Sequence, residues 1–149
     1  MKKFSVSVLS IFILSILIVF QNCGEKDKET DKERALRILQ SKTWTVSSVN
    51  VPLNTATESA DWVDFTVSFT ASSTTTAQHP TGAQAVWPSG AYEVSDDGNL
   101  VTRSIDNVVM TFNPIDDTNF TARFTVPAGT EIGSGRIASL EGEYTFNMK

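Results

Sequence analysis

Residues 120–126 read Phe-Thr-Ala-Arg-Phe-Thr-Val, and this stretch decides the fold of the chain. Apolar and polar side chains alternate with a period of two, which is the pattern of a β-strand with one buried face. Working outward from it, the same alternation places the following side chains on inward faces: Val63, Phe65, Val67 and Phe69; Val108, Met110 and Phe112; Tyr144, Phe146 and Met148. The pattern therefore predicts several half-buried strands.

The first strand, Thr43–Val51, is less regular than the others. Trp44 and Val46 share one face while Val49 and Val51 share the other, so we expect a bulge near Ser47-Ser48. Trp44 is expected in the core at one end of the sheet.

Turn signals separate the strands, which favours hairpin links. Seven or eight short strands joined in this way predict an all-β fold, an antiparallel up-and-down barrel of about eight strands. Such a barrel has room inside for side chains or for one small ligand, and the sequence leaves both possibilities open. The turn signals are Asp96-Asp97-Gly98-Asn99, Asn113-Pro114 and Asp116-Asp117, and the phenylalanines on inward parity are Phe65, Phe69, Phe112, Phe120, Phe124 and Phe146.

One short N-terminal helix precedes the barrel. Thr30 or Asp31 can cap its start, with Glu33 in the first turn. The apolar residues between Ala35 and Leu39 gather on one face, so we expect the helix to pack against the barrel and to end near Ser41.

The N-terminus has the parts of an export signal. Lys2 and Lys3 precede a seventeen-residue apolar run, Phe4–Phe20, and the only cysteine of the chain, Cys23, follows it. This arrangement looks like a bacterial lipoprotein signal, in which the cysteine takes up diacylglycerol and becomes the new N-terminus. We expect a signal peptide over 1–22, a polar tether over 23–31 and the barrel domain over 32–149. An uncleaved membrane-spanning anchor is the alternative.

Charge and cysteine content exclude several classes of function. Without Lys2 and Lys3, ten basic side chains remain against seventeen acidic ones, a net charge of −7. This charge disfavours nucleic-acid binding and leaves membrane attachment to the lipid anchor. A single cysteine excludes internal disulfides and multi-thiolate metal sites, and we expect no cofactor and no metal.

Several stretches resemble the lipocalin-like domains of lipoproteins from Bacteroidota. This resemblance implies a small barrel tethered in the cell envelope, at the outer membrane, with no established chemistry. Glu25, Asp27 and Glu29 resemble the surface-export signal of such lipoproteins, interrupted here by lysines, so the membrane face stays open. The stretches are Lys42–Val49, Phe65–Phe69, Val86–Gly90, Tyr92–Val94, Arg103 with Asp106, Gly135-Arg136, Leu140, Gly142 and Tyr144–Phe146.

No residue pattern indicates catalysis. His79 is the only histidine and lies in a polar segment before Pro80, so we interpret it as an exposed loop residue rather than as a base. Asp96-Asp97 and Asp116-Asp117 fall at hairpin tips, where aspartate is favoured because it bonds its own backbone. They lack the ligand spacing of a calcium loop, whereas a glycosidase pair stays open at this point because its two carboxylates meet only in the fold. We therefore expect a protein that is not an enzyme.

Three aromatic residues are the candidates for ligand binding: Trp62, Trp87 and Tyr92. At a barrel mouth they would contact a sugar or an apolar molecule. The alternative interpretation is that the two tryptophans hold loops against the barrel. The sequence thus favours a non-catalytic binding module for a small apolar or glycan ligand. A structural or accessory envelope lipoprotein that acts through protein contacts is the second hypothesis, and the long connection Pro127–Gly142 is the first place to look for such a surface.

Overall fold

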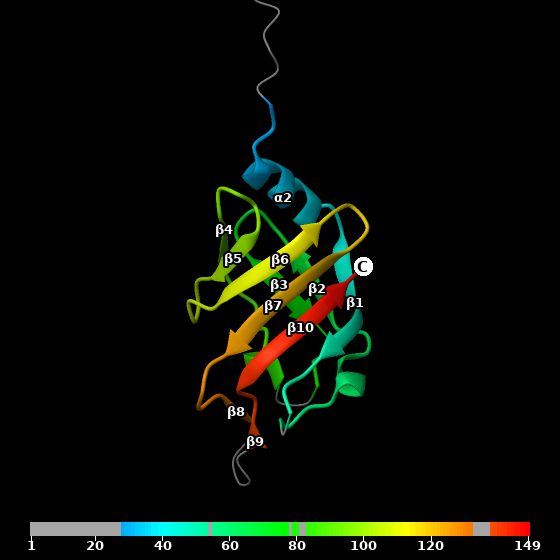
Figure 1. Ribbon diagram of the computed structural model, residues 1–149, viewed down its shortest axis with the longest axis vertical. Coiled ribbons are helices and arrows are strands. Elements are labelled where there is room, and N and C mark those ends of the chain that lie inside the picture. Colours follow the sequence, from blue (N-terminus) through cyan, green and yellow to red (C-terminus); the bar gives the residue numbers. More distant parts are fainter. Residues whose placement is uncertain (1–27, 54, 78, 81–82, 133–137) are drawn as a thin grey trace, which may run out of the picture.

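A computed structural model of the chain describes residues 28–53, 55–77, 79–80, 83–132 and 138–149. Eight antiparallel strands form one sheet that curls into a nearly closed barrel, with one short helix across an end (Figure 1). The prediction of an all-β up-and-down barrel preceded by a short helix is confirmed.

Strands that follow one another along the chain are also neighbours in the sheet. The order is β3-β2-β1-β10-β7-β6-β5-β4, and a bridge between Thr74 and Gly90 closes the barrel between its two edge strands. A two-stranded ribbon, β8–β9, lies within the long connection to the last strand, whose residues 133–137 are outside the described residues. The bounds are α2 Asp31–Leu39, β1 Thr43–Asn50, η1 Ser59–Trp62, β2 Thr66–Phe69, β3 Thr74–Ala77, η2 Ala83–Ala85, β4 Tyr92–Val94, β5 Leu100–Arg103, β6 Val109–Ile115, β7 Phe120–Val126, β8 Glu131–Ile132, β9 Ala138–Ser139 and β10 Gly142–Met148.

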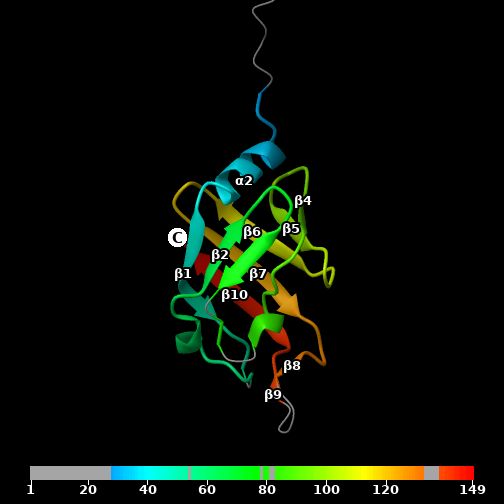
Figure 2. The same ribbon diagram turned by 180° about the vertical axis from the view of Figure 1, so that it is seen from behind.

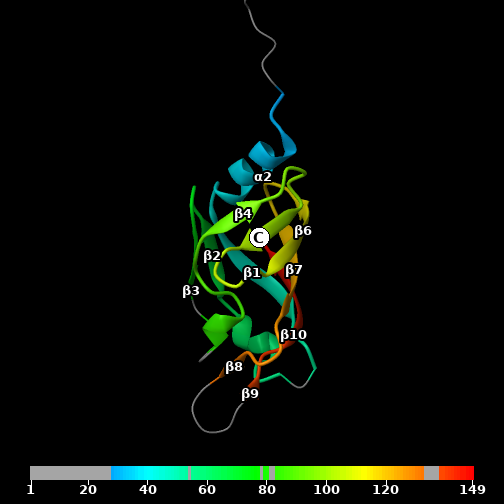
Figure 3. The same cartoon turned by 90° about the vertical axis from the view of Figure 1, so that its left-hand side faces the viewer.

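Helix α2 begins where the sequence predicts. The Thr30 hydroxyl accepts a hydrogen bond from the Glu33 backbone N–H, and the Glu33 carboxylate accepts one from the Thr30 N–H, which together form a capping box. Ile38 and Leu39 are buried on the inner face. Figures 2 and 3 show the helix lying across one end of the barrel, with β8 and β9 at the other end.

Strand β1 joins the two parts of the sheet. Thr43–Thr45 pair with β2, and Val46–Asn50 pair with β10. The register shifts between Val46 and Ser48, so the predicted bulge is confirmed. A bulge bends a strand and increases its twist, which lets β1 leave one neighbour and follow the other.

The core confirms the predicted inward parity of all six phenylalanines. Each is 5% exposed or less, and Trp44 is completely buried beneath α2. We use two terms for this core. The proximal half is the part beneath α2, around Trp44, Phe69 and Tyr92. The distal half is the part toward the opposite end, around Thr57, Trp62, His79, Trp87 and Tyr144.

Two local predictions are wrong. Val63 was expected on a buried strand face, but it is 65% exposed, because the chain turns between η1 and β2 and places Trp62 inside instead. Asn113-Pro114 was expected to be a turn, but β6 continues to Ile115. The pairing of β6 with β7 skips these two residues, which accommodates a proline that cannot donate to the ladder.

Candidate functional site

Aromatic rings fill the interior of the barrel. The ring centroid of Trp62 lies 5.3 Å from that of Phe65 and 5.0 Å from that of Phe146. The Trp87 centroid lies 5.7 Å and 5.3 Å from the same two rings, and 5.4 Å from Phe124. These side chains occupy the space that an internal ligand would need.

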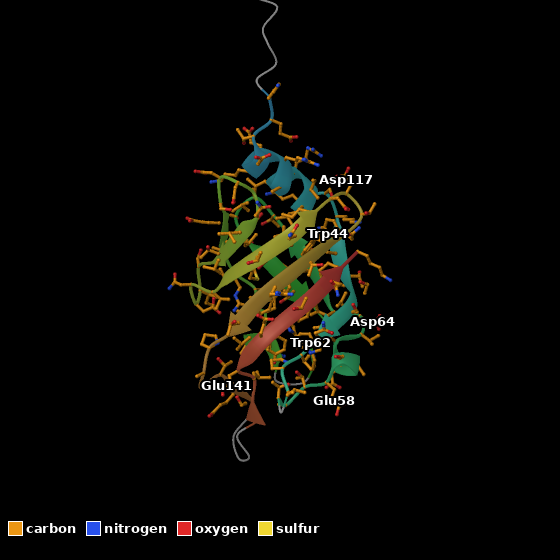
Figure 4. All side chains as sticks on the ribbon, in the orientation of Figure 1. Trp44, Glu58, Trp62, Asp64, Asp117 and Glu141 are labelled. Carbon is orange, nitrogen blue, oxygen red and sulfur yellow. The ribbon has the colours of Figure 1, made fainter. Side chains whose placement is uncertain are left out.

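The structure brings two of the three predicted ligand residues together. Trp62 comes from the end of η1 and Trp87 from the loop before β4, and both are completely buried against Phe65 and Phe146. Tyr92 lies elsewhere, in the proximal half, where its ring packs 5.3 Å from Phe69. The candidate site therefore centres on Trp62 and Trp87, and Figure 4 shows Trp62 low on the barrel, away from Trp44.

Buried polar groups in the proximal half have hydrogen-bond partners. The Trp44 indole N–H donates to the Leu39 carbonyl at 2.9 Å. The Tyr92 hydroxyl donates to the Thr70 carbonyl at 2.7 Å and accepts from the Gln40 side chain at 3.1 Å. This half is bonded in the way expected of a folded core.

The distal half differs, because it holds buried polar atoms that find no partner in the described part of the chain. A buried donor or acceptor left unpaired costs about 1–3 kcal/mol, so natural cores contain few of them. Each calls for an explanation, such as local strain, a functional role, or an ordered water or ion. The atoms are Thr57 Oγ1, Trp62 Nε1, His79 Nδ1, Trp87 Nε1 and Tyr144 Oη.

Two members of this group are Tyr144, on β10, and Thr57, in the loop between β1 and η1. Burial raises the pKa of the Tyr144 phenol, and the nearby hydroxyls of Thr57 and Thr55 offset part of the rise. The Thr55 hydroxyl itself donates to the carbonyls of Pro52 and Thr57. The Thr57 hydroxyl reaches the Tyr144 oxygen only in poor hydrogen-bond geometry, so this contact lowers the phenol pKa without satisfying either group fully.

His79 corrects a prediction. It was expected to be an exposed loop residue, but its ring is partly buried, 5.1 Å from the Phe65 ring and 6.2 Å from the Trp62 ring. Its Nε2 bonds the Thr76 hydroxyl at 2.8 Å. Burial lowers the pKa of the imidazole, because the charged form loses solvation.

An ion pair between the buried Arg103 and the more exposed Asp106 fixes the loop that carries Trp87. The guanidinium of Arg103 bonds both carboxylate oxygens of Asp106 and donates to the Val86 carbonyl. Burial lowers the pKa of Arg103 and Asp106 opposes that shift. Because Val86 directly precedes Trp87, this contact holds the tryptophan loop against β5.

The acidic pairs lie at hairpin tips, as predicted. Asp97 accepts bonds from the Ser95 hydroxyl and the Asn99 N–H, which lower its pKa. Asp116 accepts from the Thr118 hydroxyl and from the N–H groups of Thr118 and Asn119, with the same effect. These carboxylates stabilise their own turns. Within the described ranges, no three His, Cys, Asp or Glu side chains gather closely enough to hold a metal ion.

The predicted lipid attachment residue, Cys23, lies outside the described residues, as do the predicted signal peptide and the start of the tether. From Lys28 onward, the described chain contains no helix with the length and hydropathy needed to cross a membrane.

We compared the chain with known protein families and with curated proteins. No family model matches this chain, and no curated protein matches it.

Sequence reasoning missed three members of the distal group: Thr57, His79 and Tyr144. Tyr144 reads as an ordinary core position in an alternating strand, and Thr57 lies in a polar loop without periodicity. No local pattern reveals that their polar atoms are buried without a hydrogen-bond partner. Arg103 carries a usable signal, since it shares the inward parity of Val101, where a charged residue is rare.

Proposed function

We propose that this chain is a lipid-anchored envelope lipoprotein with a lipocalin-like barrel that serves as a non-catalytic binding module. Cys23, which follows the apolar run after Gln21 and Asn22, supports the anchor, which we place at the outer membrane. The ligand is a small apolar molecule or a glycan, bound at the distal half of the barrel.

The observation that carries this proposal is the set of unpaired polar atoms in the distal half, which includes the indole N–H groups of Trp62 and Trp87. Indole N–H groups donate and never accept, so both tryptophans need acceptors. A ligand with an apolar surface and one or two acceptor oxygens would satisfy them while it contacts the aromatic rings. The rings must shift to admit it, because they fill the interior.

The end of the barrel at which the chain enters the domain indicates which end would face the membrane. The chain enters the domain at α2, across the proximal end of the barrel (Figure 1). An anchor attached there would hold the proximal end toward the membrane. The distal end would then face away from the lipid surface, where a ligand or a partner can approach.

The filled interior also fits the second hypothesis, an accessory lipoprotein that acts through protein contacts. The outer face of β6, β7 and β10 has two shallow hollows, of about 330 and 290 Å³. Arg123 lines both of them, beside Glu143 in the larger one. This broad polar face could join an envelope complex without any internal ligand.

A titration tests the proposed function. The domain from Lys28 to Lys149 is titrated with a neutral apolar dye and, separately, with neutral monosaccharides, while tryptophan emission is recorded. We expect saturable binding of one class, weakened about tenfold or more in Trp87→Phe, which corresponds to about 1.4 kcal/mol. Trp44→Phe makes the same substitution in the proximal half and should leave the affinity unchanged. Absence of binding to both classes, or equal losses in the two variants, would contradict the proposal.

A further inference from the structure

The hairpin between β6 and β7 carries the sequence Asn119-Phe120-Thr121. An asparagine followed two residues later by serine or threonine, with any residue except proline between them, is the acceptor sequence for N-linked glycans in exported proteins. No other asparagine of the chain has a hydroxyl residue at that spacing. A match of three residues arises easily by chance, so the position of the motif in the fold has to decide its meaning.

The structure places this asparagine where an enzyme can reach it. Asn119 is exposed at the tip of the hairpin, and Thr121 is partly exposed at the start of β7. Phe120 between them is buried, with its ring centroid 4.8 Å from those of both Trp44 and Phe112. Because alternate residues of an extended chain share a face, the amide and the hydroxyl lie on the same outward side, about 7 Å apart along the strand.

The turn itself does not depend on the Asn119 side chain. The Asp116 carboxylate closes the turn by accepting from the backbone N–H groups of Thr118 and Asn119, and the Asp116 N–H donates to the Asn119 carbonyl. The Asn119 side chain donates from Nδ2 to the Thr118 hydroxyl at 2.8 Å, in an exposed contact. Water replaces such a bond at little cost, so Nδ2 is available for chemistry while the backbone stays in place.

The surface beside the acceptor has room for a sugar. A hollow of about 290 Å³ lies on the outer face of β6 and β7, and Thr121, two residues after Asn119, lines it. Thr111, Asn113 and Arg123 complete the lining. The hollow has the volume of about ten water molecules, and its hydroxyl, amide and guanidinium groups can bond sugar hydroxyls. An attached glycan can therefore lie against this face without displacing the core.

The acceptor lies at the end of the barrel that the tether would hold near the membrane. Figure 4 shows Asp117, two residues before Asn119, beside the end covered by α2, whereas Trp62 lies toward the opposite end. Five residues lead from Cys23 to Lys28, and they span at most about 18 Å. An N-glycan is transferred from a lipid-linked donor in the membrane, so this end is the one closer to the donor.

We infer that Asn119 is the acceptor of an N-linked glycan, transferred from a lipid-linked sugar diphosphate. In the transfer, Nδ2 attacks the anomeric carbon of the first sugar and a C–N bond forms. The bond from that carbon to the diphosphate oxygen breaks, Nδ2 gives up one proton, and the lipid diphosphate leaves. The inference goes beyond the proposed ligand site, which lies in the distal half, and it shares with the proposed function only the export of the chain.

Mass spectrometry of the full chain, isolated from the membranes of its native cells, tests the inference. Trypsin cleaves after Arg103 and Arg123 and releases residues 104–123 as one peptide. We expect this peptide to carry the added mass of sugar residues, localised to Asn119 by fragmentation and resistant to the mild alkali that removes O-linked sugars. A peptide found only unmodified, or a sugar located on a threonine, would overturn the inference.

Variants expressed in the same cells supply the controls. Asn119→Gln and Thr121→Ala should each abolish the modification, whereas Thr121→Ser should retain it because serine keeps the hydroxyl. Asn113→Gln makes the same change in the same peptide, where Ile115 stands at the position of the hydroxyl residue, and should leave the sugar in place. Urea midpoints equal to that of the parent chain would exclude misfolding as the cause of a loss. Sugar retained in Asn119→Gln, or lost in Asn113→Gln, would overturn the inference.

Acyl labelling in the same preparation separates this inference from the proposed anchor. A protein that carries labelled fatty acid but no sugar would overturn the glycan and leave the anchor unaffected. A protein that carries neither and stays in the cytoplasm would contradict the export on which both depend.

Discussion

His79 is the residue whose surroundings differ most from what its sequence neighbours suggest. Its ring packs edge-on against Trp62 and Phe65, and the one bond of its Nε2 is to the Thr76 hydroxyl. No carboxylate forms an ion pair with it in the described part of the chain. Protonation would therefore place a charge against aromatic rings with little compensation.

This environment predicts a pH dependence of stability. Burial lowers the folded-state pKa of His79 below its ordinary value of 6.5. Below about pH 6.5 the unfolded state thus binds more protons than the folded state, and the unfolding free energy should fall as the pH decreases toward about 5. Urea unfolding between pH 7.5 and 5 measures the effect. Since the chain has one histidine, His79→Gln should flatten this part of the curve. An equal slope in both proteins would assign the dependence to other groups.

Residue-level prediction from sequence succeeded wherever an alternating strand fixes which side chains face inward. It failed at Val63, which is exposed because a 3₁₀ turn interrupts the alternation. A period-two pattern has no signal for such a turn, since Val63, Phe65, Val67 and Phe69 remain apolar at every second position. Contacts between segments that are distant in the sequence determine where this turn forms.

At the scale of elements, the turn between β4 and β5 lies in close contact with α2 at the proximal end. Gly98 has a φ of +73°, and a Cβ atom there would lie 2.7 Å from the Asp31 carbonyl oxygen. The turn therefore fits beneath the helix only because residue 98 lacks a side chain. The Lys32–Asp96 ion pair beside it is exposed and adds little.

Gly98→Ala should loosen α2 from the barrel. Gly129→Ala is the matched control, because Gly129 has a similar φ of +81° but open space around its Cβ position. Both changes add backbone strain, whereas only the first forces the helix to move, at an extra cost of about 1–3 kcal/mol. Urea unfolding measures the difference, and hydrogen exchange should show faster exchange of the α2 amides in Gly98→Ala alone. Equal destabilisation of the two variants would contradict the prediction, because it would mean that the close approach of Gly98 to α2 adds no cost beyond backbone strain.

Element-level prediction was strongest for the strands, the capped helix and the β1 bulge, since each has a local pattern of side chains. The closure of the barrel could not be predicted in the same way. It depends on one bridge between Thr74 and Gly90, with Thr76 bonded to the Trp87 carbonyl and the Ser89 hydroxyl. Thr74, Thr76 and Ser89 are polar and Gly90 lacks a side chain, and nothing in their spacing indicates that they pair.

At the scale of the whole molecule, the proposed function has two parts: the lipid anchor attaches the protein to the membrane, and the barrel binds the ligand. Cys23→Ser should release the protein from membranes or leave an uncleaved precursor, because the lipid acceptor is gone. Fractionation of cells that express the variant, with labelled fatty acid as the tracer, measures this. Acyl labelling that persists unchanged in Cys23→Ser would refute the lipoprotein assignment.

In the proximal half of the barrel the buried polar groups are hydrogen-bonded, whereas the distal half contains buried polar atoms without a partner in the described residues. Residues that bind a ligand are often unfavourable for stability, so their removal commonly stabilises the free protein. The distal half has this property, since several of its buried donors and acceptors face no partner. This division of the core is the central claim, and it can be tested before any ligand is known.

The most direct test compares the unfolding free energies of Tyr144→Phe and Tyr92→Phe. Each variant removes one buried hydroxyl and leaves the ring. Tyr92→Phe breaks the bond to the Thr70 carbonyl and should lower stability by about 1 kcal/mol. Tyr144→Phe removes an unpaired oxygen and should leave stability unchanged or raise it by up to about 1 kcal/mol. If Tyr144→Phe instead destabilises the protein as much as Tyr92→Phe, the Tyr144 hydroxyl is hydrogen-bonded like that of Tyr92, which contradicts the proposed division of the core.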